Sequence, residues 1–462
     1  MSSAGMVRRW ALLFLLCAML MGAYAPVFAA ETDDALDALP DTSHANAIYL
    51  YNITSSSVLY TKNEDVLIDP GPTVKLMTAL VVLENLGNDL DKSIIVEERM
   101  VADVYGSNIN LQVGEVVTIE QLLNALVIGN SNDAAAVLAN IVAGSIDAFV
   151  VMMNEKASAL GASSTVYTNP TGLHDDSMVT TAADTAKIAL YLYKFSVYRE
   201  IAKQPSYVMD ATNKSKERII YSRNYFISTA TEYKYYTPSI NGLNAGGTND
   251  AGFCVVASSI YANIEYLCIV MGADQEYITE LDENGEEVIK ERNIYSFVVA
   301  QEMLWWAYFN FSYVRVLDTS TIICEVPVSL SDECEYIALM PENAIDLFLP
   351  NGADVSRDIN YSWILHTDTL TAPVQAGQVV GIITLIYNDS IAGRVNLVAK
   401  SNVSRSEWRY VLSLVKTFVS STIFRTTAIA LVVIAVLYVL INSVVRYERA
   451  QAQQKKGRNS RL

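Results

Sequence analysis

Three short polar runs hold the side chains of this chain that could do chemistry. They are Lys75, the stretch Asn130-Ser131-Asn132, and the stretch Asn244-Ala245-Gly246 with Thr248 just beyond it. Lys75 can take up a proton or hold an anion, whereas the amides and hydroxyls donate and accept hydrogen bonds. Lys75 is the only ionisable side chain in these runs, so the residues around it are the most informative about function.

Lys75 stands in the first turn of a helix predicted from Val74 to Leu86. A turn-rich entry, Pro70-Gly71-Pro72, runs directly into apolar residues at helical spacing. Residues three apart share a helix face, so position 72 faces the lysine. Pro72 has no hydroxyl, no thiol and no transferable proton.

The cysteines and histidines indicate no metal site, and no cofactor is predicted. The three histidines, His44, His174 and His366, are far apart and form no cluster with cysteines. Of the five cysteines, one lies in the N-terminal segment. Cys254 and Cys268 fall in predicted strands and are expected to be buried thiols. Cys324 and Cys334 flank a predicted hairpin, where the sequence allows either a disulfide or two thiols.

The elements that must position these groups give an α+β fold. A hairpin is predicted at residues 47–60, and strands return at 252–259 and 266–272, so distant segments should close one sheet. Between them lies a helical middle, with helices expected at 74–86, 119–128, 133–143, 146–160 and 182–195. From residue 314 to residue 404 short strands and turns predict a small β-sandwich.

Both ends of the chain carry membrane signals. Arg8 and Arg9, an apolar run and a small residue at Ala29 predict a signal peptide over 1–29, with an uncleaved anchor as the other interpretation. Thr426–Val445 gives twenty uncharged residues, about 30 Å of helix, followed by a basic tail at 446–462. Positive charge marks the tail as cytoplasmic and places the large domain outside the cell membrane in a single-pass topology. Residues 405–425 read either as an interfacial amphipathic helix or as a helix packed on the domain above.

The charge balance excludes one class of partner. The chain has 32 basic and 50 acidic residues. Without the two arginines of the signal, and without the six basic residues and one acid of the tail, the exported part carries about −25. Such a surface repels nucleic acid and anionic polymers, so nucleic-acid binding is not expected.

The chain resembles one family over nearly its whole length. Lys75-Leu-Met-Thr-Ala-Leu80, Gly106-Ser-Asn-Ile-Asn-Leu-Gln-Val-Gly114, Ser131-Asn-Asp-Ala-Ala135, Asn169-Pro-Thr-Gly-Leu-His-Asp175 and Ala251-Gly-Phe-Cys254 follow one another as in D-alanyl-D-alanine carboxypeptidases, the low-molecular-mass penicillin-binding proteins. The resemblance implies a transpeptidase/β-lactamase-like domain over 30–313 and the family's C-terminal sandwich over 314–404. It also implies peptidoglycan stem peptides ending in D-Ala-D-Ala as the substrate class, and β-lactams as covalent inhibitors.

The resemblance assigns catalytic roles to three motifs, and this chain departs from each. In the family a serine stands three residues before the lysine, which accepts its proton; here that position is Pro72. Thr73 is two residues from Lys75 and points to another face, so it is not expected to substitute.

The second motif is Ser-x-Asn, where the serine assists proton transfer. Asn132 matches, but Asn130 takes the serine position and cannot shuttle a proton as a hydroxyl does. Ser131 is expected to cap the helix that follows. The third motif is Lys-Thr-Gly, whose cation and hydroxyl hold the substrate carboxylate. Asn244 and Ala245 replace them, and only Gly246 is kept, which removes a contact of roughly 1.5–3 kcal/mol.

No catalytic motif is therefore intact, and a membrane-anchored pseudoenzyme is predicted. Lys75 is expected to be satisfied by Asn130, Asn132 or water, or to bind an anion; Asn132, Asn244 and Thr248 are the other candidates for a residual ligand site. The expected role is binding a cell-wall protein or peptidoglycan. The alternatives are an active carboxypeptidase with displaced catalytic groups, and a spacer that lifts the upper domain off the bilayer.

Overall fold

The computed structural model describes residues 38–459, apart from residues 88, 103, 229–232, 282–286 and 388. The predicted signal peptide lies outside the described residues. The chain divides into two compact units. The first contains the described residues up to Ser312 together with Pro350–Gly352, and the second contains Tyr313–Leu349 and the chain from Ala353 onward.

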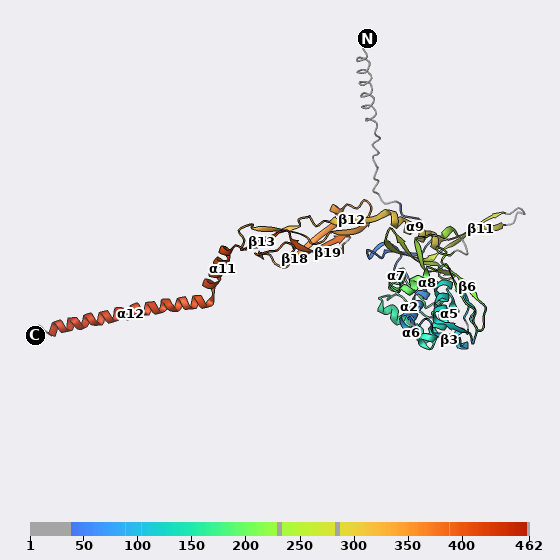
Figure 1. The fold of residues 1–462 in the computed structure, drawn as a ribbon, viewed down its shortest axis with the longest axis horizontal. Helices are drawn as coiled ribbons and strands as arrows, with labels where there is room; N and C mark the ends of the chain where they lie inside the picture. Colours follow the sequence, from blue (N-terminus) through green and yellow to red (C-terminus); the bar gives the residue numbers. More distant parts are fainter. Residues whose placement is uncertain are drawn as a thin grey trace, which may run out of the picture. The chain divides into compact units, whose positions relative to one another are not determined.

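The first unit is built on a five-stranded antiparallel sheet of order β2-β1-β9-β8-β7 (Figure 1). Its strands are β1 (Ala47–Asn52), β2 (Ser57–Lys62), β7 (Ile240–Thr248), β8 (Gly252–Tyr261) and β9 (Ile264–Ala273). Strand β1 pairs with β9, from Ala47 opposite Met271 to Asn52 opposite Tyr266. The prediction of a sheet closed by segments distant in sequence is confirmed. Strand β7 forms one edge of this sheet.

The helices between the strands match the predicted spans within three residues at each end. They are α2 (Val74–Leu86), α4 (Ile119–Gly129), α5 (Asn132–Ala143), α6 (Ile146–Ala159) and α7 (Ala182–Leu192). Helix α8 (Ser196–Ala202) was not predicted. The remaining elements of this unit are the short helices η1 (Gly71–Thr73), α3 (Glu98–Val101) and η2 (Tyr233–Tyr235), the long helix α9 (Tyr295–Asn310), and three two-stranded sheets. These sheets pair β3 (Ser93–Ile95) with β4 (Val116–Thr118), β5 (Ser206–Met209) with β6 (Arg218–Tyr221), and β10 (Gln275–Leu281) with β11 (Glu287–Ile294).

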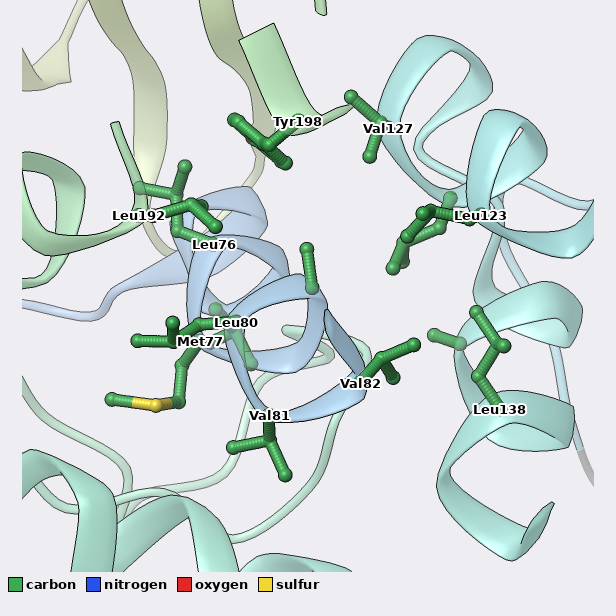
Figure 2. Close-up of a cluster of buried hydrophobic side chains, with 14 of the residues drawn as sticks. Leu76, Met77, Leu80, Val81, Val82, Leu123, Val127, Leu138, Leu192 and Tyr198 are labelled. Carbon is green, nitrogen blue, oxygen red and sulfur yellow. The ribbon is translucent and has the colours of Figure 1, made fainter. Parts of the chain in front are cut away.

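Helix α2 is the centre of the helical layer, and its apolar side chains point in several directions around its axis (Figure 2). Leu76, Met77 and Leu80 are fully buried. Side chains of α4, α5, α7 and α8 surround the helix, among them Leu123 and Leu138. A helix that is apolar all round belongs in a core, and each fully buried side chain of this size stabilises the fold by about 1.5–3 kcal/mol. The element that carries Lys75 is therefore rigidly held.

The second unit is a β domain. A six-stranded sheet has the order β16-β18-β19-β14-β13-β17, and β12 pairs with β15 in a second sheet. The strands are β12 (Phe311–Leu317), β13 (Cys324–Ser329), β14 (Tyr336–Pro341), β15 (Ile345–Pro350), β16 (Ile359–Leu365), β17 (Leu370–Thr371), β18 (Val379–Tyr387) and β19 (Ser390–Ala399), with the short helix α10 (Val355–Asp358) before β16. Cys324 and Cys334 are free thiols, so the disulfide is not formed. Cys254 and Cys268 are buried thiols, as expected.

Two helices close the described chain. Helix α11 (Glu407–Ser420) has no buried residue, and its first turn is tied to the β domain by the Arg409–Asp332 ion pair. Helix α12 (Thr422–Asn459) contains the predicted span and is apolar enough over Thr422–Gln453 to cross a bilayer.

Candidate functional site

A cleft of about 440 Å³ opens where the start of helix α2 meets the end of strand β7. The loops at Gly106 and at Thr171 form further walls, and Phe297 of helix α9 closes one side. Among the predicted site residues, the lining includes Pro72, Lys75, Asn130, Asn132, Gly246 and Thr248. Tertiary structure thus brings three runs far apart in sequence to one cavity.

Pro72 is buried in the short helix η1 directly before α2. A methyl group built on Gly246 would lie 3.1 Å from Cβ of Pro72, so the proline ring packs against the backbone of β7. Proline suits the first turn of a helix, where its missing N–H leaves no bond unmade. The same residue leaves the cleft without a side-chain oxygen and without a main-chain donor at this point.

Thr73, the neighbouring hydroxyl, is already engaged. Its Oγ1 donates to the carbonyl of Pro70 at 2.7 Å, and its side chain is buried. This bond is local to the turn and gives no contact with Lys75. The geometry agrees with the expectation that Thr73 does not face the lysine.

Lys75 has a different partner from those expected. Its Nζ donates to the carbonyl of Thr171 at 2.5 Å and not to Asn130 or Asn132. The side chain is only 6% exposed, and this burial lowers the pKa of Lys75 to about 7. Thr78, one turn later, donates to the carbonyl of Pro170 at 2.7 Å. Helix α2 therefore holds the 170–171 segment as the opposite wall of the cleft.

Asn130 ends helix α4 in the left-handed conformation, with φ of 52°. This conformation favours asparagine over most residues. Its Nδ2 donates to the carbonyl of Ala245 on β7 at 2.5 Å. The residue at the predicted proton-transfer position is thus a structural tie between the helical layer and the sheet.

Ser131 and Asn132 begin helix α5, and one expectation for them is wrong. Ser131 occupies the N-cap position, but its hydroxyl makes no capping bond and donates instead to the carboxylate of Asp133. The carboxylate of Asp133 also accepts the backbone N–H groups of Ile109 and Leu111. Nδ2 of Asn132 donates to the carbonyl of Tyr105 at 2.7 Å, and its Oδ1 has no partner among the described residues.

The third run lies on β7, and its residues are not all in the cleft. Asn244 is buried and is not among the lining residues; its Nδ2 donates weakly to Oδ1 of Asn130 at 3.3 Å. Oγ1 of Thr248 accepts the N–H of Ala251 at 3.0 Å. Of the four candidates for a residual ligand site, Lys75, Asn132 and Thr248 therefore line the cavity and Asn244 does not.

Comparison with known proteins assigns the chain that forms this cleft to a family. A sequence profile described as D-alanyl-D-alanine carboxypeptidase matches residues 34–275, more than half of the chain. The chain belongs to the D-alanyl-D-alanine carboxypeptidase family. A second profile, the C-terminal domain of penicillin-binding protein 5, matches residues 311–405. The chain is thus a carboxypeptidase-family protein of peptidoglycan metabolism with a following β domain.

Individual relatives agree with this assignment. The D-alanyl-D-alanine carboxypeptidase DacF of Bacillus subtilis is 26% identical over 396 residues, which is 85% of this chain and 94% of that protein. DacC of Escherichia coli is 26% identical over 370 residues, covering 78% of this chain and 84% of the relative. The fold is also that of penicillin-binding protein 5 from Haemophilus influenzae, with a TM-score of 0.56 at 22% identity over 80% of this chain and all of the other.

Arg223 and Tyr225 are cleft residues that the sequence did not single out. They follow β6, and the main-chain N–H of Arg223 donates to the carbonyl of Ile128 at the end of α4. No hydrogen bond or ion pair joins the Arg223 guanidinium to a described residue. Nothing in the local pattern marks this residue, because its place in the cleft depends on a contact between segments almost a hundred residues apart.

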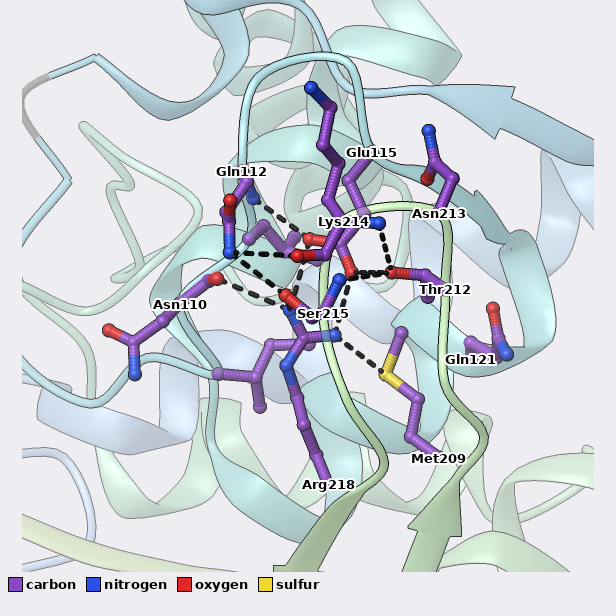
Figure 3. A network of polar contacts seen from close by, with 12 residues as sticks. Asn110, Gln112, Glu115, Gln121, Met209, Thr212, Asn213, Lys214, Ser215 and Arg218 are labelled. Atoms are coloured by element: carbon purple, nitrogen blue, oxygen red, sulfur yellow. Dashed lines mark hydrogen bonds and ion pairs between the residues drawn. The ribbon is translucent and has the colours of Figure 1, made fainter.

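A buried ion pair fixes the hairpin that leads to Arg223 (Figure 3). Glu115 has no exposed surface, and both of its oxygens accept from Arg218 of β6, at 2.8 and 3.0 Å. Oγ1 of Thr212 and the N–H of Gln112 complete the shell of the carboxylate. The network therefore holds the β5–β6 hairpin against the loop before β4.

Proposed function

We propose that this chain is a catalytically inactive member of its family, which acts in cell-wall metabolism by binding a wall protein or peptidoglycan. The observation that carries the proposal is Pro72 beside Lys75, because acyl transfer needs a nucleophile within reach of the base. Two other hydroxyls that line the cleft already donate hydrogen bonds. Oγ of Ser107 donates to the carbonyl of Gly129, and Oγ1 of Thr171 donates to Oδ1 of Asn169.

The retained cleft supports binding. Its volume of about 440 Å³ is in the range of small-ligand sites, and Lys75, Arg223 and the unpaired Oδ1 of Asn132 supply polar contacts. Loss of the lysine and threonine of the third motif at Asn244 and Ala245 weakens recognition of a terminal carboxylate. A ligand is therefore held by the remaining groups and not by the contacts that the family uses for catalysis.

The same proposal includes the topology. Residues 1–29 act as a signal peptide, 30–313 and 314–404 form the carboxypeptidase-like and sandwich domains outside the cell, and 405–425 form a juxtamembrane helix. Thr426–Val445 spans the cell membrane once, and residues 446–462 remain cytoplasmic. The excess of basic residues after the span supports this orientation.

The alternative is an active carboxypeptidase with displaced catalytic groups. A lysine whose pKa burial lowers to about 7 favours it, since such an amine is partly neutral at physiological pH and could accept a proton. No described hydroxyl hydrogen-bonds to that amine, which counts against it. The two candidates differ in whether a covalent acyl adduct forms.

The test is covalent labelling of the detergent-solubilised full chain with a fluorescent penicillin, followed by denaturing electrophoresis. We expect no labelled band and no D-alanine release from a D-Ala-D-Ala peptide. A penicillin band that survives denaturation, or steady D-alanine release, would overturn the proposal in favour of the active enzyme. Thr73→Ala serves as the control for any weak band, because it removes the nearest hydroxyl to position 72.

Binding is measured separately, by co-sedimentation with purified peptidoglycan. Wild-type chain that pellets with the polymer, with a several-fold loss in Arg223→Ala, identifies peptidoglycan as the ligand. A chain that stays in solution points to a protein partner. That partner is then sought by cross-linking in native membranes, with Arg223→Ala again as the comparison.

A further inference from the structure

The six-stranded sheet of the second unit ends in an edge strand that lacks the usual protection. Strand β16 pairs with β18 alone, over seven consecutive residue pairs and without a register shift. Natural edge strands are commonly blunted by lysine, proline or a bulge. Residues 359–365 contain no lysine, no proline and no charged residue of any kind.

Large apolar side chains stand on this edge in contact with solvent. Tyr361 is 53% exposed, Trp363 41% and Ile364 77%. An open edge also presents a row of main-chain donors and acceptors that no strand of the described chain takes up. The combination of unpaired backbone and exposed apolar surface is a template for one more strand.

We propose that β16 pairs in antiparallel fashion with β16 of a second copy of this chain, about a two-fold axis through Ser362. A two-fold axis perpendicular to the sheet keeps each residue on its own face, so Ser362 lies opposite itself. Tyr361 then lies opposite Trp363, which makes two aromatic cross-strand pairs. Asp358 lies opposite His366, and no like charges meet.

Moving the two-fold axis by one residue in either direction gives less favourable cross-strand pairs, so this register should be preferred. A shift of the axis to Trp363 places Asp358 opposite Asp368, two like charges. A shift to Tyr361 places Asp358 opposite Ile364, the most exposed apolar residue of the strand. The axis through Ser362 is the one that matches both the aromatic and the charged positions.

The charge of the molecule argues for this edge as the place where two copies meet. The chain carries a formal net charge of −18, so copies repel each other over most of their surface. Residues 359–365 carry no charge, so two copies that meet there avoid this repulsion at the contact itself. If α12 anchors the chain as proposed above, copies confined to one membrane also meet at a high effective concentration.

Cysteine cross-linking of the full chain in membranes tests the register. Directly opposite residues have Cβ atoms about 4.5–5.5 Å apart, close to disulfide geometry. Ser362→Cys should therefore give a disulfide-linked dimer on oxidation with copper phenanthroline. Asn360→Cys and Ile364→Cys face the same side but lie about 13 Å or more from their own copies, and should stay monomeric.

The double variant Asn360→Cys/Ile364→Cys should cross-link again, because these two positions oppose each other. Wild type measures the background from the native cysteines. Absence of a Ser362→Cys dimer, or equal cross-linking by all three single variants, would overturn the proposal.

A second measurement does not depend on cysteine. Ile364→Lys places a charge on the edge, and in light scattering of the detergent-solubilised chain it should convert a dimer into a monomer. Ile391→Lys, at a residue 59% exposed on β19 away from the edge, should leave the dimer intact. A wild-type monomer at every concentration, or a dimer unaffected by Ile364→Lys, contradicts the proposal; thermal unfolding confirms that both variants are folded.

Discussion

Lys75 and Glu115 are both buried ionisable groups of the first unit, but they differ in how many partners they have. Glu115 has no exposed surface and receives Arg218 through two bonds, together with Thr212 and a main-chain N–H. Burial alone would raise the pKa of Glu115, but these partners hold it below its usual value. Among the described residues Lys75 has one main-chain acceptor and no counter-ion, and burial lowers its pKa to about 7.

The difference separates a paired structural charge from a buried lysine that has no counter-ion among the described residues. A buried charge is tolerated when it is paired and fully hydrogen-bonded. The Glu115 network meets that condition and positions a hairpin, so its residues contribute to folding. The Lys75 site does not, and it is the place where the family would put reacting groups. Measurements of stability should therefore distinguish the two.

The largest effect is expected for Arg218→Ala. It leaves the carboxylate of Glu115 buried without its counter-ion, and should destabilise the first unit by about 3–5 kcal/mol. Calorimetric unfolding of the solubilised chain measures this. The matched control is Lys203→Ala, which breaks an exposed pair with Glu200 and should cost under about 1 kcal/mol. Equal losses in the two variants would contradict the structural role of the network.

Lys75→Met should change how stability depends on pH. Burial lowers the pKa of Lys75 to about 7 from 10.5, so between these values the unfolded chain binds the extra proton. Wild-type stability should rise with pH across this window relative to Lys75→Met, by at most about 1.4 kcal/mol per pH unit. Unfolding of both proteins from pH 6 to pH 10 gives the difference, and parallel curves would mean that the lysine stays charged.

Asn130→Ala tests the tie between α4 and β7. The variant loses the bond to the Ala245 carbonyl and places alanine in a left-handed conformation, for a combined cost of about 1–3 kcal/mol. Asn130→Gly removes the bond but accepts the backbone, so it should be the milder change in denaturant unfolding. If glycine is as damaging as alanine, the cost comes from the lost bond alone.

The smallest effect on stability is expected at His174, an exposed residue of the first unit. Nδ1 of His174 lies 2.6 Å from Oδ2 of Asp69, and this carboxylate raises the pKa of the histidine. The contribution to stability is present at low pH and is lost as pH rises through the raised pKa, opposite in sign to that of Lys75. His174→Gln should flatten the pH dependence in thermal unfolding. Asp176→Asn, which removes the exposed second partner of the ring at 3.3 Å, should flatten it less.

The helices and the sheet were predictable because their signals are periodic and local. The span of α2 follows from apolar spacing and the turn before it, and β1 and β9 follow from their apolar strands. The partner of Lys75 was not predictable, since a main-chain carbonyl 96 residues away has no sequence signature. The capping bond expected of Ser131 is absent because the N–H groups of Asp133 and Ala134, which it would accept, are taken by side-chain oxygens of Asn108 and Asp133.

The sequence by itself determined which chemical groups are missing at the positions of the family's motifs. The side chain of proline at position 72 has no oxygen in any fold, and asparagine at position 244 carries no charge wherever it is placed. Only the tertiary structure decided which groups share the cleft. It brings Arg223 to the lining and leaves Asn244 out of it, because both positions depend on how β7 and the β5–β6 hairpin pack against α4. Chemistry is a property of single side chains, whereas a site is a property of segments that meet only on folding.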